Sequence, residues 1–362
     1  MHAMTSKERI IAALEGEPCD RPPFCPFLAY VWENYPQEIQ DAGQPAFLRS
    51  VEADPLWRGA PCPVKVRSPA VERESVASDG SRRMELGTPV GTLRMVWTRS
   101  PDGNTSFLTE HPLKTLEDLK IMAWIEEHSV LELNHESVEK HLAGAGREGL
   151  SLGQLLPRGK SSFQTLIEHS IGTQEMAYLL ADTPEAVEAL LEPMVANDLR
   201  AAKLSSESGF YGYFITWEDS STQNYSPTQY RKYIASEIRQ WCALLRSNGQ
   251  KYIQHACGHL KDLLPIIADS GIFAVESLSP PPTGNISLKD ARTLLGSVGI
   301  IGGIEPTKLL WTSESDLPAY AEEVLRDGGG GPFVLANSDS CPPGVNPEKF
   351  RAISRTAAQF HK

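Results

Sequence analysis

The spacing of short apolar segments along the chain is the feature that most restricts its fold. Eight such runs have the length and composition of β-strands, at 24–28, 55–57, 150–156, 209–217, 251–255, 273–278, 298–304 and 332–336. Amphipathic stretches separate the later runs, at about 183–205, 227–247, 258–269, 288–295 and 313–327. This alternation predicts an α/β fold with a parallel sheet, and eight strands favour a (β/α)8 TIM barrel over an open doubly wound sheet.

Two further segments lie outside this alternation of strands and helices. A capped helical stripe over residues 5–15 predicts an N-terminal helical extension. Residues 64–109 show alternation, Gly and Pro but little helical period, and 85–93 has the pattern of a turn between two strands. We interpret 64–109 as a β-hairpin insertion within a single domain that spans residues 1–362.

The composition restricts the partners of the chain. Its 362 residues are 41% hydrophobic and 22% charged, and the formal net charge is −12. Nucleic acids and anionic membrane surfaces are bound through clustered Lys and Arg, which are not apparent here. No apolar run approaches the roughly 20 residues of a membrane helix, the first residues lack an apolar signal segment, and the six cysteines do not make a disulfide scaffold. These features predict a cytoplasmic protein without nucleic-acid or membrane partners.

A candidate metal site follows the fifth apolar run. His255 and Cys257 lie two positions apart at its end, and Cys341 follows the last run. Because side chains two apart in a strand point to the same face, His255 and Cys257 can aim at one point. Three N and S ligands with an open fourth position describe a catalytic zinc site. The alternative is that these cysteines are small buried hydrophobes, which is the usual role of a buried cysteine.

Three carboxylates lie at or near predicted strand ends. Glu218 and Asp219 directly follow Trp217, and Glu276 lies inside an apolar run. The carboxyl ends of barrel strands converge on one mouth, where these groups could bind a cation, exchange protons or complete a zinc shell. Glu218 and Asp219 could equally form a capping and loop segment before Ser226. Glu276 is harder to explain as a structural residue, because a buried carboxylate requires a cation or a hydrogen-bond donor.

Together these motifs resemble the uroporphyrinogen decarboxylase superfamily, and within it the zinc-dependent methyltransferases that exchange methyl groups with a separate corrinoid protein. The resemblance covers nearly the whole chain. Its matching segments are 21–23 (RPP), 88–93 (TPVGTL), 111–114 (HPLK), 116–119 (LEDL), 217–221 (WEDSS), 226–227 (SP), 255–258 (HACG), 302–304 (GGI) and Cys341. The resemblance implies zinc bound by His255, Cys257 and Cys341, and a corrinoid (cobalamin) cofactor carried by a corrinoid-binding partner protein.

The segment after the first predicted strand departs from the decarboxylase branch. Decarboxylases carry arginines there that hold the carboxylates of the porphyrinogen, whereas residues 27–35 of this chain contain none. A tetrapyrrole with acidic side chains would therefore lack its cationic clamp. We expect Tyr30, Trp32 and Tyr35, together with Trp217, to line a pocket for an uncharged or aromatic methyl donor instead.

The resemblance implies two directions of methyl transfer. In an O-demethylase, zinc binds the oxygen of a methyl ether, such as a methoxylated aromatic, and a Co(I) corrinoid takes the methyl group. In the sister reaction of the coenzyme M type, zinc binds a thiol, and the thiolate takes the methyl group from methyl-cobalt(III). The segment 279–285 resembles a loop of family members similar to bacterial ether demethylases, which favours the first direction. Glu218, Asp219 and Glu276 are then candidates for a fourth zinc ligand or for a proton relay to the leaving oxygen.

Two other classes of function stay open at the level of sequence. A zinc hydrolase would use the same three ligands to activate water and would need no corrinoid. A non-catalytic protein would bind a metal or a tetrapyrrole without turnover. The oligomeric state is also open, with a homodimer as one arrangement.

Overall fold

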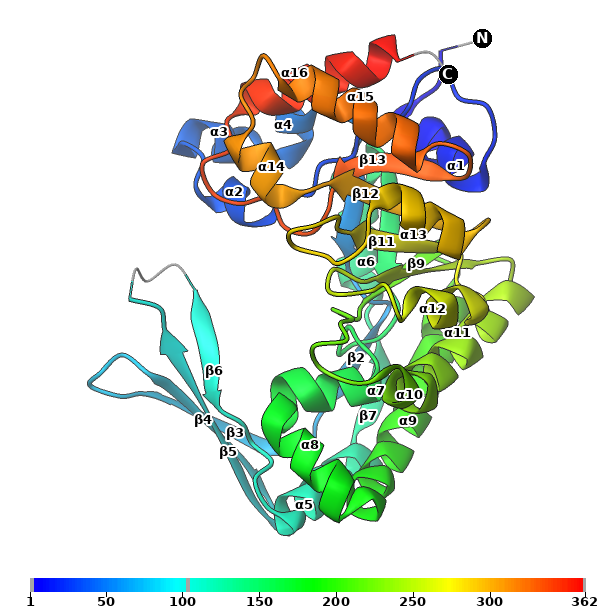
Figure 1. Ribbon diagram of the computed structural model, residues 1–362. Coiled ribbons are helices and arrows are strands. Elements are labelled where there is room, and N and C mark those ends of the chain that lie inside the picture. Colours follow the sequence, from blue (N-terminus) through cyan, green and yellow to red (C-terminus); the bar gives the residue numbers. More distant parts are fainter. Residues whose placement is uncertain (1–2, 102–104, 361–362) are drawn as a thin grey trace.

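The central sheet of the computed structural model, which describes residues 3–101 and 105–360, has seven parallel strands. Their order around the sheet is β1, β8, β9, β10, β11, β12 and β13 (Figure 1). The strands are β1 Leu56–Ala60, β8 Leu150–Gln154, β9 Tyr213–Trp217, β10 Lys251–His255, β11 Ala274–Leu278, β12 Gly299–Ile304 and β13 Phe333–Asn337. Seven of the eight apolar runs identified in the sequence are therefore strands of one sheet.

The first predicted strand, 24–28, is reduced to a single bridge at Phe24. Phe24 pairs in parallel with Leu335 of β13, and its carbonyl accepts a hydrogen bond of 2.8 Å from the N–H of Asp54, just before β1. Prolines on both sides of this bridge shorten the ladder, because a proline nitrogen has no hydrogen to donate. Phe24 thus lies between β13 and the segment that leads into β1. The predicted α/β barrel fold is confirmed as a curled sheet of seven parallel strands, with the first predicted strand rudimentary.

A helix closes the amino-terminal end of the barrel. Ile10 and Leu14 of α1 (Ser6–Glu15) belong to the same buried cluster as Ile215, Ile253 and Ile301 of the strands. A capping box begins α1, as its sequence predicts. The N-terminal helical extension is therefore confirmed, and its apolar face packs against the interior of the barrel.

Helices surround the central sheet and extend below it in the view of Figure 1. Their bounds are α2 Ala29–Glu33, α3 Gln37–Ala42, α4 Gln44–Ser50, α5 Leu116–His128, α6 His135–Ala143, α7 Ser162–Thr165, α8 Thr173–Asp182, α9 Pro184–Glu207, α10 Pro227–Gln229, α11 Ala235–Ser247, α12 Leu264–Asp269, α13 Leu288–Leu295, α14 Pro306–Trp311, α15 Leu317–Gly328 and α16 Pro347–Gln359. Two π-turns, η2 Leu166–Ser170 and η3 Tyr230–Ile234, continue α7 and α10. Among the described residues, none of the helices combines the length and the apolar character needed to cross a bilayer.

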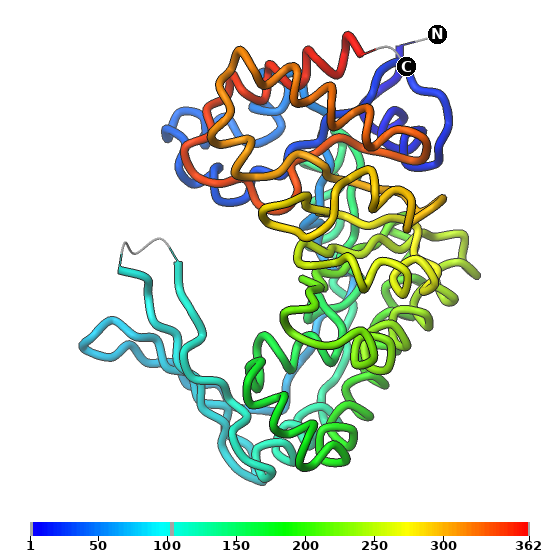
Figure 2. The backbone as a smooth tube through the Cα atoms, in the orientation of Figure 1, coloured from blue at the N-terminus to red at the C-terminus, as the bar shows by residue number. Residues whose placement is uncertain are grey.

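The segment 64–109 forms more than the single β-hairpin that its sequence predicts. β2 (Val64–Arg67) pairs with β7 (Val130–Leu133), and an antiparallel sheet contains β3 Val71–Val76, β4 Arg82–Thr88, β5 Gly91–Arg99 and β6 Ser106–Glu110. The turn at 85–93 joins β4 to β5. The sequence does not predict the edge strand β3, because every residue in it is exposed. Such a strand lacks the alternation of apolar and polar residues that marks a half-buried strand. The four-stranded sheet extends away from the barrel (Figure 2).

A buried acidic group lies between α7, α9 and α11. The hydroxyl of Ser162 is 2.8 Å from an oxygen of Asp198 and 3.2 Å from an oxygen of Glu237. Arg158 forms an ion pair of 2.8 Å with Asp198. Burial, together with the charge of Asp198, raises the pKa of Glu237 well above its ordinary value. Folding therefore favours the protonated form of Glu237.

A Glu237→Gln variant is expected to be more stable than wild type, and the difference in their free energies of unfolding should grow as the pH rises. A carboxyl whose pKa is raised on folding contributes its full stability below the unfolded pKa, which is near 4.5 for Glu237, and loses it as the pH rises toward the folded pKa. Gln has the same shape without the charge, so the variant avoids this loss, which is about 1.4 kcal/mol for each unit of pKa difference. Urea unfolding at about pH 5 and about pH 8 measures the effect. A stability difference between variant and wild type that is the same at both pH values would contradict it.

Candidate metal centre

Three side chains of metal-binding type meet at the carboxyl ends of two adjacent strands. His255 is the last residue of β10, Cys257 lies two positions beyond it, and Asp219 lies two positions beyond the end of β9. The ligand atoms of these three residues all lie within 4.8 Å of one another. β9 and β10 pair in parallel with Trp217 opposite His255, so the two strand ends are level. This register brings Asp219 beside the His-x-Cys motif.

Asp219 connects the other two members of the group. Its Oδ1 lies 3.2 Å from Nε2 of His255 and accepts a hydrogen bond of 3.5 Å from the thiol of Cys257. The backbone of Asp219 has φ of +38°. Such a left-handed conformation costs a non-glycine residue about 1–3 kcal/mol, and strain of this kind is concentrated at functional sites.

A buried chain of charged groups supports His255. Its Nδ1 lies 2.5 Å from Oε2 of Glu276, and Oε1 of Glu276 accepts a hydrogen bond of 2.6 Å from Nε of Arg58. The three residues lie on β10, β11 and β1, and their exposed fractions are 1%, 0% and 3%. A carboxylate on Nδ1 orients the ring and leaves Nε2 for a metal, which is the usual arrangement of a ligating histidine.

The charges around His255 favour a cation at the centre of the group. Burial opposes the ionisation of His255, but the carboxylates of Glu276 and Asp219 outweigh it and hold its pKa well above the ordinary value. Against the effect of burial, Arg58 and His255 lower the pKa of Glu276 to about 2. Burial raises the pKa of Cys257 to about 11. The imidazolium therefore supplies positive charge to the surrounding acids, and a divalent metal ion could take over this role.

The second oxygen of Asp219 faces a lysine. Nζ of Lys160 lies 2.9 Å from Oδ2 of Asp219 and also forms an ion pair with Glu168. Lys160 lies in the loop between β8 and α7, and Glu168 lies in the π-turn η2. The lysine therefore binds one oxygen of Asp219, while the other oxygen faces His255 and Cys257.

Glu218 has a different set of partners from its neighbour Asp219. Its carboxylate accepts hydrogen bonds from the N–H of Ser161 at 2.9 Å, the hydroxyl of Ser161 at 2.6 Å and the hydroxyl of Thr216 at 2.7 Å. Burial raises the pKa of Glu218 to about 7 against the effect of these donors. Of the three carboxylates expected at the site, Asp219 joins the group, Glu276 supports His255, and Glu218 anchors the loop before α7.

Cys341, the expected third ligand, is not a member of the group. Its side chain is fully buried, and its Sγ lies 3.9 Å from the carbonyl oxygen of Pro342. Two backbone hydrogen bonds fix the residue, because its N–H donates to Phe27 and its carbonyl accepts from Val31, both at 3.1 Å. Burial raises the pKa of its thiol well above the ordinary value. The role of Cys341 as a ligand therefore stays a prediction from the resemblance, and Asp219 is the third residue that lies beside His255 and Cys257.

Two aromatic rings lie close to His255. The ring centre of Trp217 is 5.0 Å from that of His255, and Phe27 stacks on Trp217 with ring centres 5.8 Å apart. The guanidinium of Arg58 lies 5.1 Å from the centre of the Phe27 ring. Phe27 and Trp217 thus form an aromatic wall beside the metal-binding group.

The other three aromatic residues expected to contact substrate lie on α2 or just after it. Trp32 and Tyr35 pack against Phe47, and the hydroxyl of Tyr35 donates a hydrogen bond of 2.9 Å to the carbonyl of Val345. Tyr30 lies on α2 and is 59% exposed. The contact of Tyr30, Trp32 and Tyr35 with substrate therefore stays a prediction. Of the four aromatic residues expected there, the structure brings Trp217 to the group.

Phe27, Arg58 and Lys160 were not among the site residues predicted from the sequence. Arg58 lies just after the predicted run 55–57 and inside the observed strand β1. A buried arginine is as costly as the buried Glu276, and the two residues pair. Lys160 lies in a polar loop, and Phe27 lies among other apolar residues of the N-terminal segment. Neither of these two stands out without the fold.

The donor set of the group suits zinc. Imidazole nitrogen, thiolate sulfur and carboxylate oxygen are its common protein ligands, and catalytic sites use three of them with a fourth position for substrate or water. The carboxylate behind Nδ1 of His255 is a second feature of such sites. His255, Cys257 and Asp219 are therefore the residues of this group that could hold the metal.

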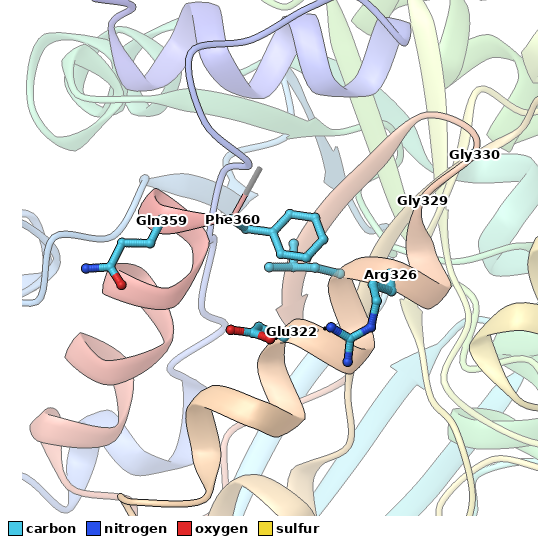
Figure 3. Close-up of a pocket in the computed structure, with 7 residues that line it drawn as sticks. Glu322, Arg326, Gly329, Gly330, Gln359 and Phe360 are labelled. Atoms are coloured by element: carbon cyan, nitrogen blue, oxygen red, sulfur yellow. Dashed lines mark hydrogen bonds and ion pairs between the residues drawn. The ribbon is translucent and has the colours of Figure 1, made fainter. Parts of the chain in front are cut away.

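A separate cavity of about 670 Å³ (Figure 3) lies beside the loop that leads into the amino end of β13. Its lining residues are Glu322, Leu325, Arg326, Gly329, Gly330, Gln359 and Phe360. They belong to α15, to the end of α16 and to the loop that leads into the amino end of β13. Active sites of barrel enzymes lie at the carboxyl ends of the strands. The position of this cavity therefore does not make it a competing candidate.

Comparisons with known proteins agree with the fold. The family model described as "Uroporphyrinogen decarboxylase (URO-D)" matches residues 163–360, which is more than half of the chain. No curated protein matches the sequence. A solved structure described as "methyltransferase from Methanosarcina mazei" has a TM-score of 0.62 at 15% identity, with 98% of each chain covered. A B12-independent methionine synthase from Shewanella sp. W3-18-1 has a TM-score of 0.45 at 10% identity, with 94% of this chain and 96% of the other covered. At this identity, the Methanosarcina structure shows a shared fold.

Proposed function

The chain belongs to the uroporphyrinogen decarboxylase family, and on this premise we propose that it is a zinc-dependent methyltransferase. In the proposed reaction, a methyl group moves from a small methyl ether, such as a methoxylated aromatic, to the Co(I) corrinoid of a partner protein. The Methanosarcina protein, which shares the fold and is described as a methyltransferase, supports methyl transfer as the class of reaction.

One observation carries the proposal. Ligand atoms of Asp219, His255 and Cys257 lie within 4.8 Å of one another at the mouth of the barrel. Structural zinc sites usually have four protein ligands, whereas three ligands are typical of a site that binds substrate at the metal. The group therefore supports a metal that takes part in the reaction.

Each residue of the centre has a distinct role in this account. His255, Cys257 and Asp219 would hold zinc, which when bound supplies a Lewis acid that makes the ether oxygen a better leaving group. Glu276 keeps Nε2 of His255 directed at the metal position through its contact with Nδ1. Trp217, stacked on Phe27, offers a flat apolar surface for the ring of an aromatic methyl donor.

The charges at the mouth support methyl transfer over porphyrinogen decarboxylation. A tetrapyrrole with several carboxylates requires cations that are free to bind them. Arg58 is already paired with Glu276, and Lys160 is paired with Asp219 and Glu168. Both cations are therefore engaged in holding the metal-binding group.

The proposal is tested with zinc-loaded protein, cobalamin reduced to Co(I), and a series of methoxylated benzenes and phenols. We expect the absorbance of Co(I) to decay as methyl-cobalt(III) appears, with zinc required and an equal amount of demethylated product released. A Lys120→Met variant, changed at an exposed lysine on α5, is the matched control and should react like wild type. Demethylated product that forms without cobalamin would contradict the proposal, and so would methyl transfer from methylcobalamin to a thiol without any ether cleavage.

A further inference from the structure

Lys160 occupies a position that is costly for a lysine. Its side chain is 8% exposed, and its Nζ contacts the carboxylates of Asp219, at 2.9 Å, and Glu168. Burying an ammonium group is unfavourable unless it is paired. Lys160 is therefore a buried cation that two acids keep charged.

Asp219 needs more support than the other two members of the metal-binding group. His255 lies within a strand and is braced by Glu276, whereas Asp219 lies on a loop, with a side chain that is 37% exposed and a φ of +38°. A strained residue keeps one conformation only where its surroundings over-determine it. The contact from Lys160 to Oδ2 supplies such a restraint on the side chain of Asp219.

We propose that Lys160 is a positioning residue of the metal centre. By holding Oδ2 of Asp219, it presents Oδ1 to a metal ion beside Nε2 of His255 and Sγ of Cys257. Ligating carboxylates are commonly held by such outer contacts, which fix the ligand and tune the metal. This inference rests on the proposed function, because it takes the zinc centre as given and adds a residue that does not itself touch the metal.

Glu168 makes a cation at this position compatible with a metal ion. The Lys160 and Glu168 pair carries no net charge, so it can orient Asp219 without the full repulsion that an isolated ammonium would exert on zinc. Glu168 also accepts a hydrogen bond from the side chain of Gln164 and lies in the π-turn η2. Glu168 is thus held by both Lys160 and Gln164.

The test is the affinity for zinc of a Lys160→Met variant, measured by competition with a chromophoric chelator. Met retains the length and the apolar stem but has no charge and no donor. We expect zinc binding to weaken by about 10–100-fold, the usual cost of losing an outer contact to a metal ligand. Lys160→Arg, which retains a charged donor, should recover most of this loss. Lys120→Met should bind zinc like wild type, because Lys120 is an exposed residue that pairs with Glu117.

Cobalt substitution provides a readout that a merely structural role would not change. In the Co²⁺-loaded Lys160→Met variant we expect altered visible bands, because the carboxylate ligand is displaced, and an unchanged thiolate band from Cys257. Zinc affinity and cobalt bands equal to wild type in the folded variant would overturn the inference. If urea unfolding shows that Lys160→Met does not fold, Lys160→Gln carries the same test with the same expected and contrary results. Wild type that binds no zinc would instead overturn the proposed function, so the two failures are distinguishable.

Discussion

A His255→Ala variant is expected to bind zinc about a hundredfold more weakly than wild type. Structural zinc sites with four ligands contribute about 10–16 kcal/mol, or roughly 3 kcal/mol for each ligand. A change of about 3 kcal/mol corresponds to about two orders of magnitude in affinity. The loss should be at least as large as this, because Glu276 and Asp219 then also lose the group that orients them. Chelator competition measures the affinity, and methyl transfer to Co(I) cobalamin should disappear with the metal.

His128→Ala is the matched control for this prediction. His128 is an exposed histidine at the end of α5, so its replacement should leave zinc binding unchanged. If His255→Ala binds zinc with the affinity of wild type, the zinc site lies elsewhere in the protein. Cys341→Ala is also informative, because the geometry predicts that it keeps zinc while the family resemblance predicts that it loses zinc.

An Arg58→Met variant is expected to lose about 3–5 kcal/mol of the free energy of unfolding, the usual cost of removing one partner of a buried ion pair. Arg58 donates to Glu276 at 2.6 Å, and both side chains are at most 2% exposed. Met fills much of the space of Arg but leaves the Glu276 carboxylate with His255 as its remaining charged partner. Urea unfolding of the metal-free proteins measures the difference, so that zinc does not add to the stability of either.

The double variant Arg58→Met with Glu276→Gln separates charge from packing. Removing both charges leaves no unpaired carboxylate, so the double variant should be clearly more stable than Arg58→Met alone. If the two changes together destabilise the protein by the sum of their separate effects, the buried pair does not act as a unit. If Arg58→Met lowers the free energy of unfolding by less than about 1 kcal/mol, the result would contradict the account, because exposed ion pairs contribute about that amount.

The barrel was predictable from the sequence because parallel strands covered by helices are buried on both faces. Such strands appear as continuous apolar runs, and 251–255, 273–278 and 298–304 were recognised for this reason. The four-stranded sheet was recognised only at its turn between β4 and β5. Its edge strand β3 is exposed throughout, and cross-strand pairing leaves no periodic signal in an exposed strand.

The metal-binding group was partly predictable from the sequence. His255 and Cys257 were predicted as ligands because side chains two positions apart in a strand point to the same face. Asp219 was predicted as a site residue because it comes just after the adjacent strand. The partners that hold these residues depend on pairings between distant segments. Lys160 reaches Asp219 from the loop after β8, and Arg58 reaches Glu276 from β1. The placement of Cys341 likewise depends on backbone contacts with the N-terminal segment, which no local pattern records.

X-ray absorption at the zinc edge of the zinc-loaded wild-type protein tests the central claim most directly. Sulfur and lighter ligands differ in both bond length and scattering, with Zn–S near 2.3 Å and Zn–N or Zn–O near 2.0–2.2 Å. The account predicts one sulfur ligand, from Cys257, with nitrogen and oxygen ligands that include His255 and Asp219. Two sulfur ligands would contradict it, because the second would have to come from a cysteine outside the group, such as Cys341.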